Sequence, residues 1–539
     1  MKLFEKVFFG RSNGTPQSMP QPDREQVAND AGGYVYALDP WDRLDRFLIL
    51  GSEGGTYYAG ERELTKANAM HLVSLIHEDG VRAVERIVEI SQAGRAPKVS
   101  PAIFALAMCA GFGDEATRQL ALGRGLNAVC RTGSHLLEFA SYVKQFRGWG
   151  RALRGGVRAW YESAPVGELE YQVVKYQNRA GYTHRDLLRL SHPQAPQGAR
   201  GALFAWIVKG SAPATGAGLP LIDAFERSKT MNGADAATCA AFVRESKLPR
   251  EAIPTEWLRE PAVWEALLET MPMTALIRNL ATMTRVGLLT PKAEATRTVV
   301  ARLANGAWLR KARVHPIAVL AALETYRSGR GARGNTSWKP IDMIVDALEA
   351  AFYLAFETLE PSGARMLVAL DVSGSMACGS VSGIPGLTPR VASAAMAMTH
   401  AKTEPDLTVM AFSDGFVKLD IGRDDRLGAV LDRTNDLPFQ GTDCSLPMLY
   451  ALEHRMSIDA FVIYTDNETW AGTIHADEAL RRYRERTGIA AKLVVVAMTS
   501  TGFTIADPND AGMLDVVGFD ASAPATIARF AAPGRASLG

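Results

Sequence analysis

After the segment EPSGAR the chain alternates short apolar runs with helical stretches. The apolar runs MLVALD, LTVMAFS, DAFVIYTD and KLVVVAM end at Asp371, Ser413, Asp466 and Met498. Stretches such as RVASAAMAMTHAK and ADEALRRYRERTG lie between these runs. This alternation is the βαβ pattern of an open, mainly parallel sheet, in which ligands bind beyond the carboxyl ends of the strands. We therefore expect an α/β domain over residues 361–539, with the two aspartates and the serine at its ligand-binding edge.

Hydroxyl side chains accompany the first of these aspartates. The segment DVSGSM places Asp371, Ser373 and Ser375 in one turn, and the glycine between the serines lets the backbone curl tightly. Two later loops offer Thr442 in QGTDCS and Asp466 in YTDNET. Carboxylates and hydroxyls form a hard oxygen ligand set that suits Mg²⁺ first, with Mn²⁺ or Ca²⁺ as alternatives. The order and spacing of these residues resemble the metal-ion-dependent adhesion site of von Willebrand A domains.

Two other interpretations of the same residues stay open. An Asp or Ser after a strand often caps the following helix. Asp371 could instead be the nucleophile of a metal-dependent phosphohydrolase. Such enzymes usually place a second carboxylate two residues later, where this chain has Ser373, and no partnered base is evident. We therefore expect no enzymatic activity. The resemblance to von Willebrand A domains implies a metal that leaves one position for the carboxylate of an acidic protein ligand.

From about Leu64 to about Glu360 the chain has a mainly helical pattern. In DGVRAVERIVEIS the residues Val81, Val84 and Val88 recur at intervals of three and four, with charged residues between them. Helix follows helix with short breaks, which predicts a bundle or an α-solenoid. Residues 1–26 are polar and rich in turn formers, and they predict a flexible N-terminal arm.

A basic and aromatic cluster lies within the helical part. Arg151, Arg154 and Arg158 are spaced to share one helix face, and Lys175 and Arg179, four apart, are expected to do the same. Further members are His184, Arg185, Arg189 and His192, with Trp149, Trp160, Tyr176 and Tyr182 interleaved. Basic side chains contact phosphates and aromatic planes stack on unpaired bases, so the cluster suits RNA. On the pattern alone it could equally be a solvated helix face whose aromatic residues belong to the core.

The composition narrows the class of protein. The net charge is +1 over 539 residues, so a nucleic-acid site must come from local clustering of basic residues. The five cysteines are scattered and form no CxxC pair, which argues against a disulfide scaffold or a zinc cluster and for a reducing compartment. No stretch approaches the ~18 apolar residues that a membrane span needs. We expect a soluble cytoplasmic protein that does not contact a membrane.

Five segments carry a more specific resemblance. LGSEGGTYY, MPMTALIRNL, VHPIAVLAALETY, AFYLAFE and LDVSGSM occur in this order. In these segments the chain is similar to the Ro ribonucleoprotein autoantigen family, and more narrowly to its bacterial Ro-sixty-related members, from about Val27 to the C-terminus. The resemblance implies HEAT-like helical repeats, the TROVE module, over residues 27–360. It also implies that the repeats close into a ring and that a von Willebrand A domain over residues 361–539 clamps the ends of the ring.

The resemblance also implies a function. Members of the family bind small noncoding Y RNAs on the basic outer face of the ring, and single-stranded 3′ ends of misfolded or structured RNAs in its central hole. A Lys, an Arg four residues later and a His in an LSH segment carry RNA binding in the family, and they correspond here to Lys175, Arg179 and His192. The implied role is RNA quality control, maturation or decay, with a 3′ exoribonuclease as a partner. A metal-dependent adhesion scaffold and a phosphohydrolase remain the alternatives.

Overall fold

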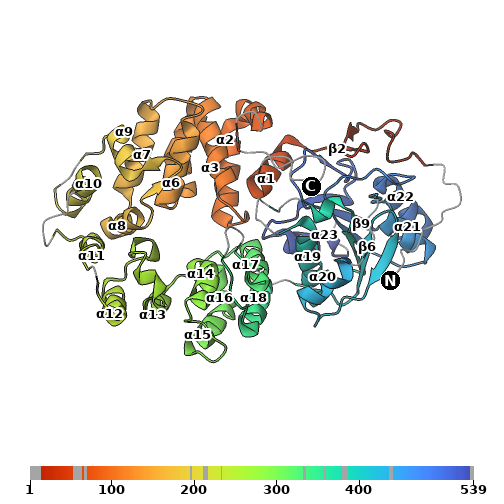
Figure 1. Cartoon of the computed structure of the whole chain (residues 1–539). Coiled ribbons are helices and arrows are strands. Elements are labelled where there is room, and N and C mark those ends of the chain that lie inside the picture. The colour runs from red at the N-terminus through yellow and green to blue at the C-terminus, as the bar shows by residue number, and fades with distance from the viewer. Residues whose placement is uncertain are drawn as a thin grey trace.

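The computed structural model divides the chain into a helical part and an α/β part (Figure 1). It describes residues 14–51, 64–65, 69–194, 197–210, 217–231, 233–331, 336–356, 360–378, 381, 387–435, 437 and 441–533. Residues 1–13 of the expected arm lie outside the described residues, as does most of the LGSEGGTYY segment.

The first half of the helical part runs from α1 to α9. Its helices are α1 (Pro40–Leu50), α2 (Met70–Ala93), α3 (Ser100–Phe112), α4 (Glu115–Leu120), α5 (Leu126–Val129), α6 (Gly133–Val143), α7 (Arg151–Ser163), α8 (Val166–Lys175) and α9 (His184–Ser191). A π-helical turn, η2 (Ala121–Gly125), joins α4 to α5, and a hairpin of β3 (Asn178–Arg179) and β4 (Tyr182–Thr183) joins α8 to α9.

The second half of the helical part runs from α10 to α18. Its helices are α10 (Ala199–Lys209), α11 (Pro220–Ser228), α12 (Ala236–Ser246), α13 (Pro261–Thr270), α14 (Met273–Arg285), α15 (Glu294–Leu303), α16 (Gly306–Lys311), α17 (Pro316–Ser328) and α18 (Asp342–Leu354). Two 3₁₀ turns, η3 (Arg250–Ala252) and η4 (Trp257–Arg259), lie between α12 and α13.

Helix α2 shows how the periodic sequence becomes a packed repeat. Val84 and Val88 are buried and Val81 is half-buried, whereas Arg82 and Glu85 between them are exposed. A helix with one apolar face must bury that face on a neighbour. Accordingly α2 packs on α3, α3 on α6, α7 on α9, α12 on α13 and α17 on α18. Figure 1 shows the helices following an arc from α2 to α18, which confirms the helical repeat architecture. A closed ring whose hole admits RNA stays a prediction.

The α/β part contains the expected open sheet. Its strands are β5 (Met366–Asp371), β6 (Leu407–Phe412), β7 (Phe416–Leu419), β8 (Ala460–Thr465), β9 (Lys492–Ala497) and β11 (Met513–Val517). They are ordered β11-β9-β8-β5-β6-β7, and only the pairing of β6 with β7 is antiparallel. The helices of this part are α19 (Pro389–Thr403), α20 (Leu427–Asn435), α21 (Leu446–Glu453), α22 (Ala476–Thr487) and α23 (Ala523–Ala531).

Strand β5 lies at the centre of this sheet and is buried on both faces. Val368 and Leu370 belong to a core that also includes residues of α19, α23 and the helical part, whereas Leu367 and Ala369 belong to a second core with α21 and α22. The first connection from β5 leads to β6 on one side, and β8 pairs with β5 on the other side. The carboxyl end of β5 is therefore the switch point of the topology, where ligands bind in open α/β sheets.

The described residues of the expected N-terminal arm are not free. Gln17 is buried, and its Nε2 donates to Asp443 Oδ1 and to the carbonyl oxygen of Ile474, both at 2.8 Å. The next residues form strands β1 (Val27–Ala28) and β2 (Tyr34–Ala37), and β2 pairs with β10 (Phe503–Thr504) of the α/β part. The polar composition that predicted flexibility instead satisfies polar groups of distant loops, so residues 14–26 are corrected to a docked segment.

Two further sequence expectations can be compared with the fold. All five cysteines are free thiols, and Cys378 alone among them is not buried. Within the described ranges, no helix combines the length and apolarity of a membrane span.

Candidate functional site

Helix α7 carries the first three arginines of the basic cluster. Its buried face consists of Leu153, Val157, Trp160 and Tyr161. Arg151 and Arg154 lie on the opposite, exposed face. Arg158 is half-buried, and its Nε and Nη2 donate to the carbonyl oxygen of Ser191 at 3.3 and 3.1 Å. Arg158 therefore braces the C-terminal end of α9, while Arg151 and Arg154 are free to meet a ligand.

Lys175 and Arg179 do not share a helix face as the four-residue spacing predicted. Helix α8 ends at Lys175, and Arg179 lies in the β3–β4 hairpin, where Ala180 and Gly181 both adopt positive φ in the turn. The chain forms a short hairpin here instead of continuing the helix, and a turn of two residues, one of them glycine, connects the two strands.

Both of these side chains are nevertheless anchored near the surface. Lys175 Nζ donates to the Tyr171 hydroxyl at 3.1 Å. Burial lowers the pKa of Lys175, but this hydrogen bond and the neighbouring tyrosines outweigh burial, so the net shift is upward and the ammonium stays charged. Arg179 is exposed and lies 3.9 Å from Glu138 Oε2.

Helix α9 begins with a capping box in the segment THRD. The backbone N–H of Thr183 donates to Asp186 Oδ2 at 2.9 Å, and the N–H of Asp186 donates to Thr183 Oγ1 at 3.3 Å. The cap sets the helix so that Arg185 and Arg189, four apart, both point to solvent. His192 follows the helix in a left-handed conformation and is exposed.

His184 is the member of the predicted RNA set that the fold removes from the surface. It is 2% exposed, its Nδ1 lies 2.7 Å from the Tyr161 hydroxyl, and its ring stacks on Trp160. Burial lowers the pKa of His184 to about 4, so the imidazole is neutral at physiological pH. His184 is a core residue and does not contact RNA from this position.

The aromatic members of the cluster divide in the same way. Trp160 is buried, and its Nε1 donates to the carbonyl oxygen of Cys130 at 2.7 Å. Trp149, Tyr176 and Tyr182 are half-buried. Trp160 therefore belongs to the core, as the alternative interpretation of the cluster expected for its aromatic residues.

The basic residues of the cluster that remain accessible form what we call the basic surface. They are Arg151, Arg154, Lys175, Arg179, Arg185, Arg189 and His192.

The predicted metal ligands come together at the switch point of the sheet. Asp371, the last residue of β5, is buried, and its Oδ1 accepts from the N–H of Ser373 at 2.9 Å. Ser373 Oγ and Ser375 Oγ lie 2.9 Å apart. Asp466, directly after β8, accepts from the Ser375 side chain and from the N–H of Glu468. Four of the five predicted ligands are thus linked in one hydrogen-bonded network.

Thr442, the fifth predicted ligand, bonds through its backbone to the loop that follows β8. Thr442 is buried, and its carbonyl oxygen accepts from the N–H groups of Trp470 and Ala471, both at 3.0 Å. Ser413, at the end of β6, donates through Oγ to the carbonyl oxygen of Gly441 at 2.8 Å. Ser413 therefore supports the loop that carries Thr442, which gives a structural role to the hydroxyl residue that follows the strand.

The electrostatics of the site fit a cation. Burial raises the pKa of Asp371, and the nearby charge of Asp466 raises it further; burial also raises the pKa of Asp466. Asp466 Oδ2 is buried with no hydrogen-bond partner. Two buried carboxylates beside two hydroxyls, with one carboxylate oxygen unsatisfied, form a set that a divalent ion would satisfy. Among the described residues no group of three His, Cys, Asp or Glu forms an alternative metal cluster.

The sequence interpretation missed Glu468. This side chain is buried two residues after Asp466, its Oε2 accepts from the N–H of Ala31 at 3.0 Å, and its Oε1 has no hydrogen-bond partner. Burial, followed by the charges of Asp466 and Asp30, raises the pKa of Glu468 to about 8. The signal was present in the segment TDNET, where a second acid follows the first in the same loop.

Known protein families match both the helical part and the α/β part of the chain. The model of the TROVE domain matches residues 27–212 and 243–325, and that of the Ro60 vWA domain matches residues 365–531. The chain is 42% identical over 521 residues to RNA-binding protein RO60 of Deinococcus radiodurans, across 96% of this chain and 98% of that protein. It is 36% identical over 602 residues to RNA-binding protein RO60 of Caenorhabditis elegans, across 97% of this chain and 93% of that protein.

A solved structure extends the similarity to the fold. The crystal structure of the Deinococcus radiodurans RO (RSR) protein is 41% identical and superimposes with a TM-score of 0.71, across 92% of this chain and 99% of that one. Helical repeats and α/β domain thus agree with the family in sequence and in structure. The chain belongs to the Ro60 family, in which a TROVE domain is joined to a von Willebrand A domain.

Proposed function

We propose that this protein binds RNA through the basic surface and catalyses no reaction of its own. The observation that carries the proposal is the accessibility of six Arg and Lys side chains on α7, at the end of α8, on the β3–β4 hairpin and on α9. Of the acidic groups near them, Glu138 lies 3.9 Å from Arg179, Glu251 acts on Lys175, and Asp186 is engaged in the cap of α9. Such clustered cations contact phosphates. Both RO60 relatives carry the name RNA-binding protein, which supports the same conclusion.

Family membership supports a more specific proposal about the RNA that is bound. We infer that the basic surface binds small noncoding Y RNA and that single-stranded 3′ ends of misfolded or structured RNA bind within the arc of helices. The protein would then act in RNA quality control, maturation or decay, with a 3′ exoribonuclease as a candidate partner, in the cytoplasm. The helical arc and its accessible basic residues support this proposal.

The test is the salt dependence of RNA affinity. Lys175→Ala combined with Arg179→Ala should weaken binding of a structured small RNA. The slope of log affinity against log salt should fall by about 0.7 to 0.9 for each phosphate that the protein no longer neutralises. Arg285→Ala, which removes an exposed charge from α14, is the control for net charge. A slope equal to that of wild type would mean that the basic surface is only solvated.

A second measurement addresses the 3′ end. A hairpin with a single-stranded 3′ tail should bind more tightly than the same hairpin with a blunt end, because an unpaired strand is flexible and exposes its bases. The preference should tolerate changes in the tail sequence, and Y RNA should compete. Equal affinities for tailed and blunt hairpins would leave surface docking as the mode of binding.

The α/β domain supports a second candidate function, metal-dependent binding of an acidic protein ligand. Asp371, Ser373, Ser375, Thr442 and Asp466 would hold Mg²⁺, or Mn²⁺ or Ca²⁺, and the ion would supply an electrophilic position for a partner's carboxylate. The unsatisfied Asp466 Oδ2 favours this candidate. Pull-down of protein partners with Mg²⁺ and with chelator, after RNA digestion, tests it. The phosphohydrolase alternative predicts turnover of a phosphate ester that is lost in Asp371→Ala.

A further inference from the structure

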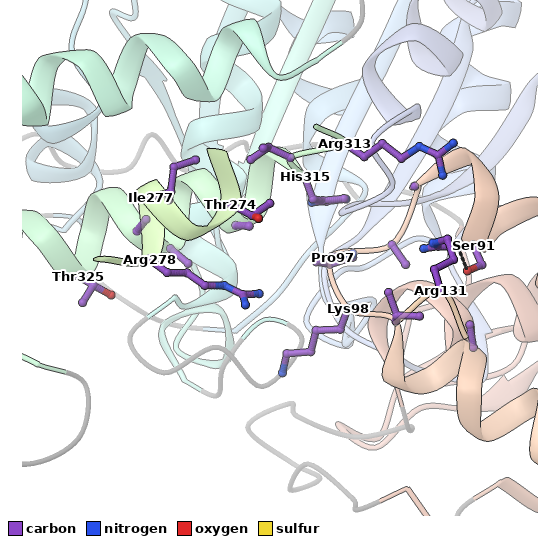
Figure 2. Close-up of a pocket in the computed structure, with 18 of the residues that line it drawn as sticks. Ser91, Pro97, Lys98, Arg131, Thr274, Ile277, Arg278, Arg313, His315 and Thr325 are labelled. Carbon is purple, nitrogen blue, oxygen red and sulfur yellow. Dashed lines mark hydrogen bonds between the residues drawn. The ribbon is translucent and has the colours of Figure 1, made fainter. Parts of the chain in front are cut away.

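A cavity of about 480 Å³ lies where the two ends of the helical arc meet. One side is formed by the end of α2, the α2–α3 loop and Arg131, and the other by α14, the segment before α17 and α17 itself. Figure 2 shows these two groups of side chains facing each other, with Lys98 and Arg131 on one side and Arg278 on the other. The cavity therefore belongs to two segments of the chain that are far apart in the sequence.

Four cationic side chains line this cavity. They are Lys98, Arg131, Arg278 and Arg313, all of them exposed. No Asp or Glu is among the described residues of the lining. Arg131 is positioned by hydrogen bonds from Nη1 to Ser91 Oγ at 3.0 Å and to the carbonyl oxygen of Ala128 at 2.9 Å. Four like charges around one space, with no acid in the lining, create a potential that favours an anion.

Two of these like charges, Arg131 and Arg313, face each other across the cavity. Burial, followed by the charge of Arg313, lowers the pKa of Arg131. Arg131 belongs to the first end of the arc and Arg313 to the second, so the repulsion acts across the boundary between them. An anion placed between these groups would turn the repulsion into attraction and hold the two ends together.

Most of the remaining lining is apolar. Ile90 and Val99 lie on one side, and Ile277, Leu280 and Val314 lie on the other. The hydroxyls of Ser91, Thr274 and Thr325 add a few hydrogen-bonding groups. Apolar walls with a small number of polar groups, in a volume within the ~300–1,000 Å³ typical of ligand pockets, suit a small organic group and not an inorganic anion alone.

We propose that this cavity binds one nucleoside phosphate unit of single-stranded RNA and thereby joins the two ends of the helical arc. The phosphate lies among Arg131, Arg278 and Arg313, where planar guanidinium groups match its geometry. The base packs against the aliphatic wall around Ile277. The inference rests on the proposed RNA-binding function and adds a specific pocket to it, away from the basic surface on α7 and α9.

The test compares binding of a labelled single-stranded oligoribonucleotide by four proteins at fixed salt. Arg278→Ala should weaken binding about tenfold, the loss expected for one charge-assisted contact. Ala281→Phe keeps every charge but fills the cavity from the next turn of α14, and it should weaken binding at least as much. Arg285→Ala removes a charge from the same helix outside the cavity lining and should change affinity less than twofold.

The unfolding temperature tests whether RNA joins the two ends of the helical arc. The oligoribonucleotide should raise the unfolding temperature of wild type and of Arg285→Ala, but not that of Ala281→Phe, because the ligand bridges the two ends only when it fills the cavity. Unfolding temperatures without RNA verify that each variant is folded. If Ala281→Phe does not fold, Arg278→Ala together with Arg313→Ala takes its place.

Three outcomes would overturn the proposal. Wild-type affinity in both Arg278→Ala and Ala281→Phe would exclude the cavity as an RNA site. A free nucleoside monophosphate that binds as tightly as the oligoribonucleotide, or a polyglutamate peptide that competes equally well, would assign the cavity to another ligand. Wild-type protein that binds no RNA would overturn the proposed function as well. Binding of a blunt hairpin distinguishes failure of the cavity proposal from failure of the proposed function. The hairpin should bind through the basic surface and not through Arg278, so its binding is kept in the first case and lost in the second.

Discussion

His315 Nε2 lies 2.8 Å from the carbonyl oxygen of Arg95. His315 is the N-cap of α17, near the end of the helical arc, and Arg95 follows α2, near its beginning. The same carbonyl accepts from the N–H of Ala521, at 3.1 Å, and the Arg95 guanidinium pairs with Asp520 at 2.5 Å. Both ends of the arc and the α/β domain therefore meet at one residue.

The first prediction concerns the acid sensitivity of this junction. Burial lowers the pKa of His315 from 6.5 to about 4, and the hydrogen bond to Arg95 opposes that shift only in part. The unfolded chain binds a proton below pH ~6.5 and the folded chain only below about 4, so folded stability falls as pH falls through this window. His315→Asn should reduce the dependence of unfolding free energy on pH between 6.5 and 4, measured by denaturant titration. His192→Asn, at an exposed position, serves as the control.

Three other histidines titrate in the same pH window and reduce the share of the pH dependence that His315 can carry. Burial lowers the pKa values of His135, His184 and His400 to about 4 as well. His315→Asn should therefore remove part of the wild-type pH dependence and leave the rest. An unchanged dependence would show that His315 is accessible to protons in the folded protein.

The second prediction concerns the ion pair at the junction. Arg95→Ala leaves the carboxylate of Asp520, whose side chain is only 6% exposed, without its partner, which should cost roughly 3 kcal/mol of stability. Arg297→Ala breaks an ion pair with Glu294 that is exposed on both sides, and it should cost less than about 1 kcal/mol. Unfolding in urea, followed by circular dichroism, compares the two. Similar small changes in both variants would mean that solvent screens the junction pair.

The third prediction separates the two histidines of the RNA set. His192→Ala should weaken RNA binding and leave the unfolding temperature unchanged, because the side chain is exposed. His184→Ala should lower stability by about 2 kcal/mol, since it removes a buried ring that contacts Tyr161 and Trp160. At temperatures where it is folded, this variant should bind RNA like wild type. Weaker RNA binding by folded His184→Ala would place His184 in the interface.

The fourth prediction concerns the metal. Mg²⁺ should raise the unfolding temperature of the wild type, because a cation offsets the repulsion between buried Asp371 and Asp466, and chelator should reverse the effect. Asp371→Ala should abolish Mg²⁺ binding in calorimetry and the thermal shift with it. Asp424→Ala, an exposed acid of the same domain, is the control. RNA affinity should stay unchanged in Asp371→Ala, and a strong decrease in the folded variant would link the two domains functionally.

Local patterns in the sequence predicted the two architectures and most of the candidate metal set. The periodicity of Val84 and Val88 predicts a helix, because both side chains are buried on one face of α2. The apolar run before Asp371 predicts a strand, and ligands bind beyond the carboxyl ends of parallel strands, so Asp371 could be assigned to the site. The segments of the resemblance are similarly local. Such patterns depend on residues a few positions apart, which is why they can be read without coordinates.

Tertiary packing alone decided which polar residues are accessible. Spacing placed Lys175 with Arg179 on one helix, but the chain turns into a hairpin after α8, and His184 enters the core against Tyr161. Gln17 is buried against Asp443, which lies 426 residues away. His315 and Arg95 meet across 220 residues. Hydrogen bonds and burial of this kind depend on distances in space, which the order of residues along the chain does not contain.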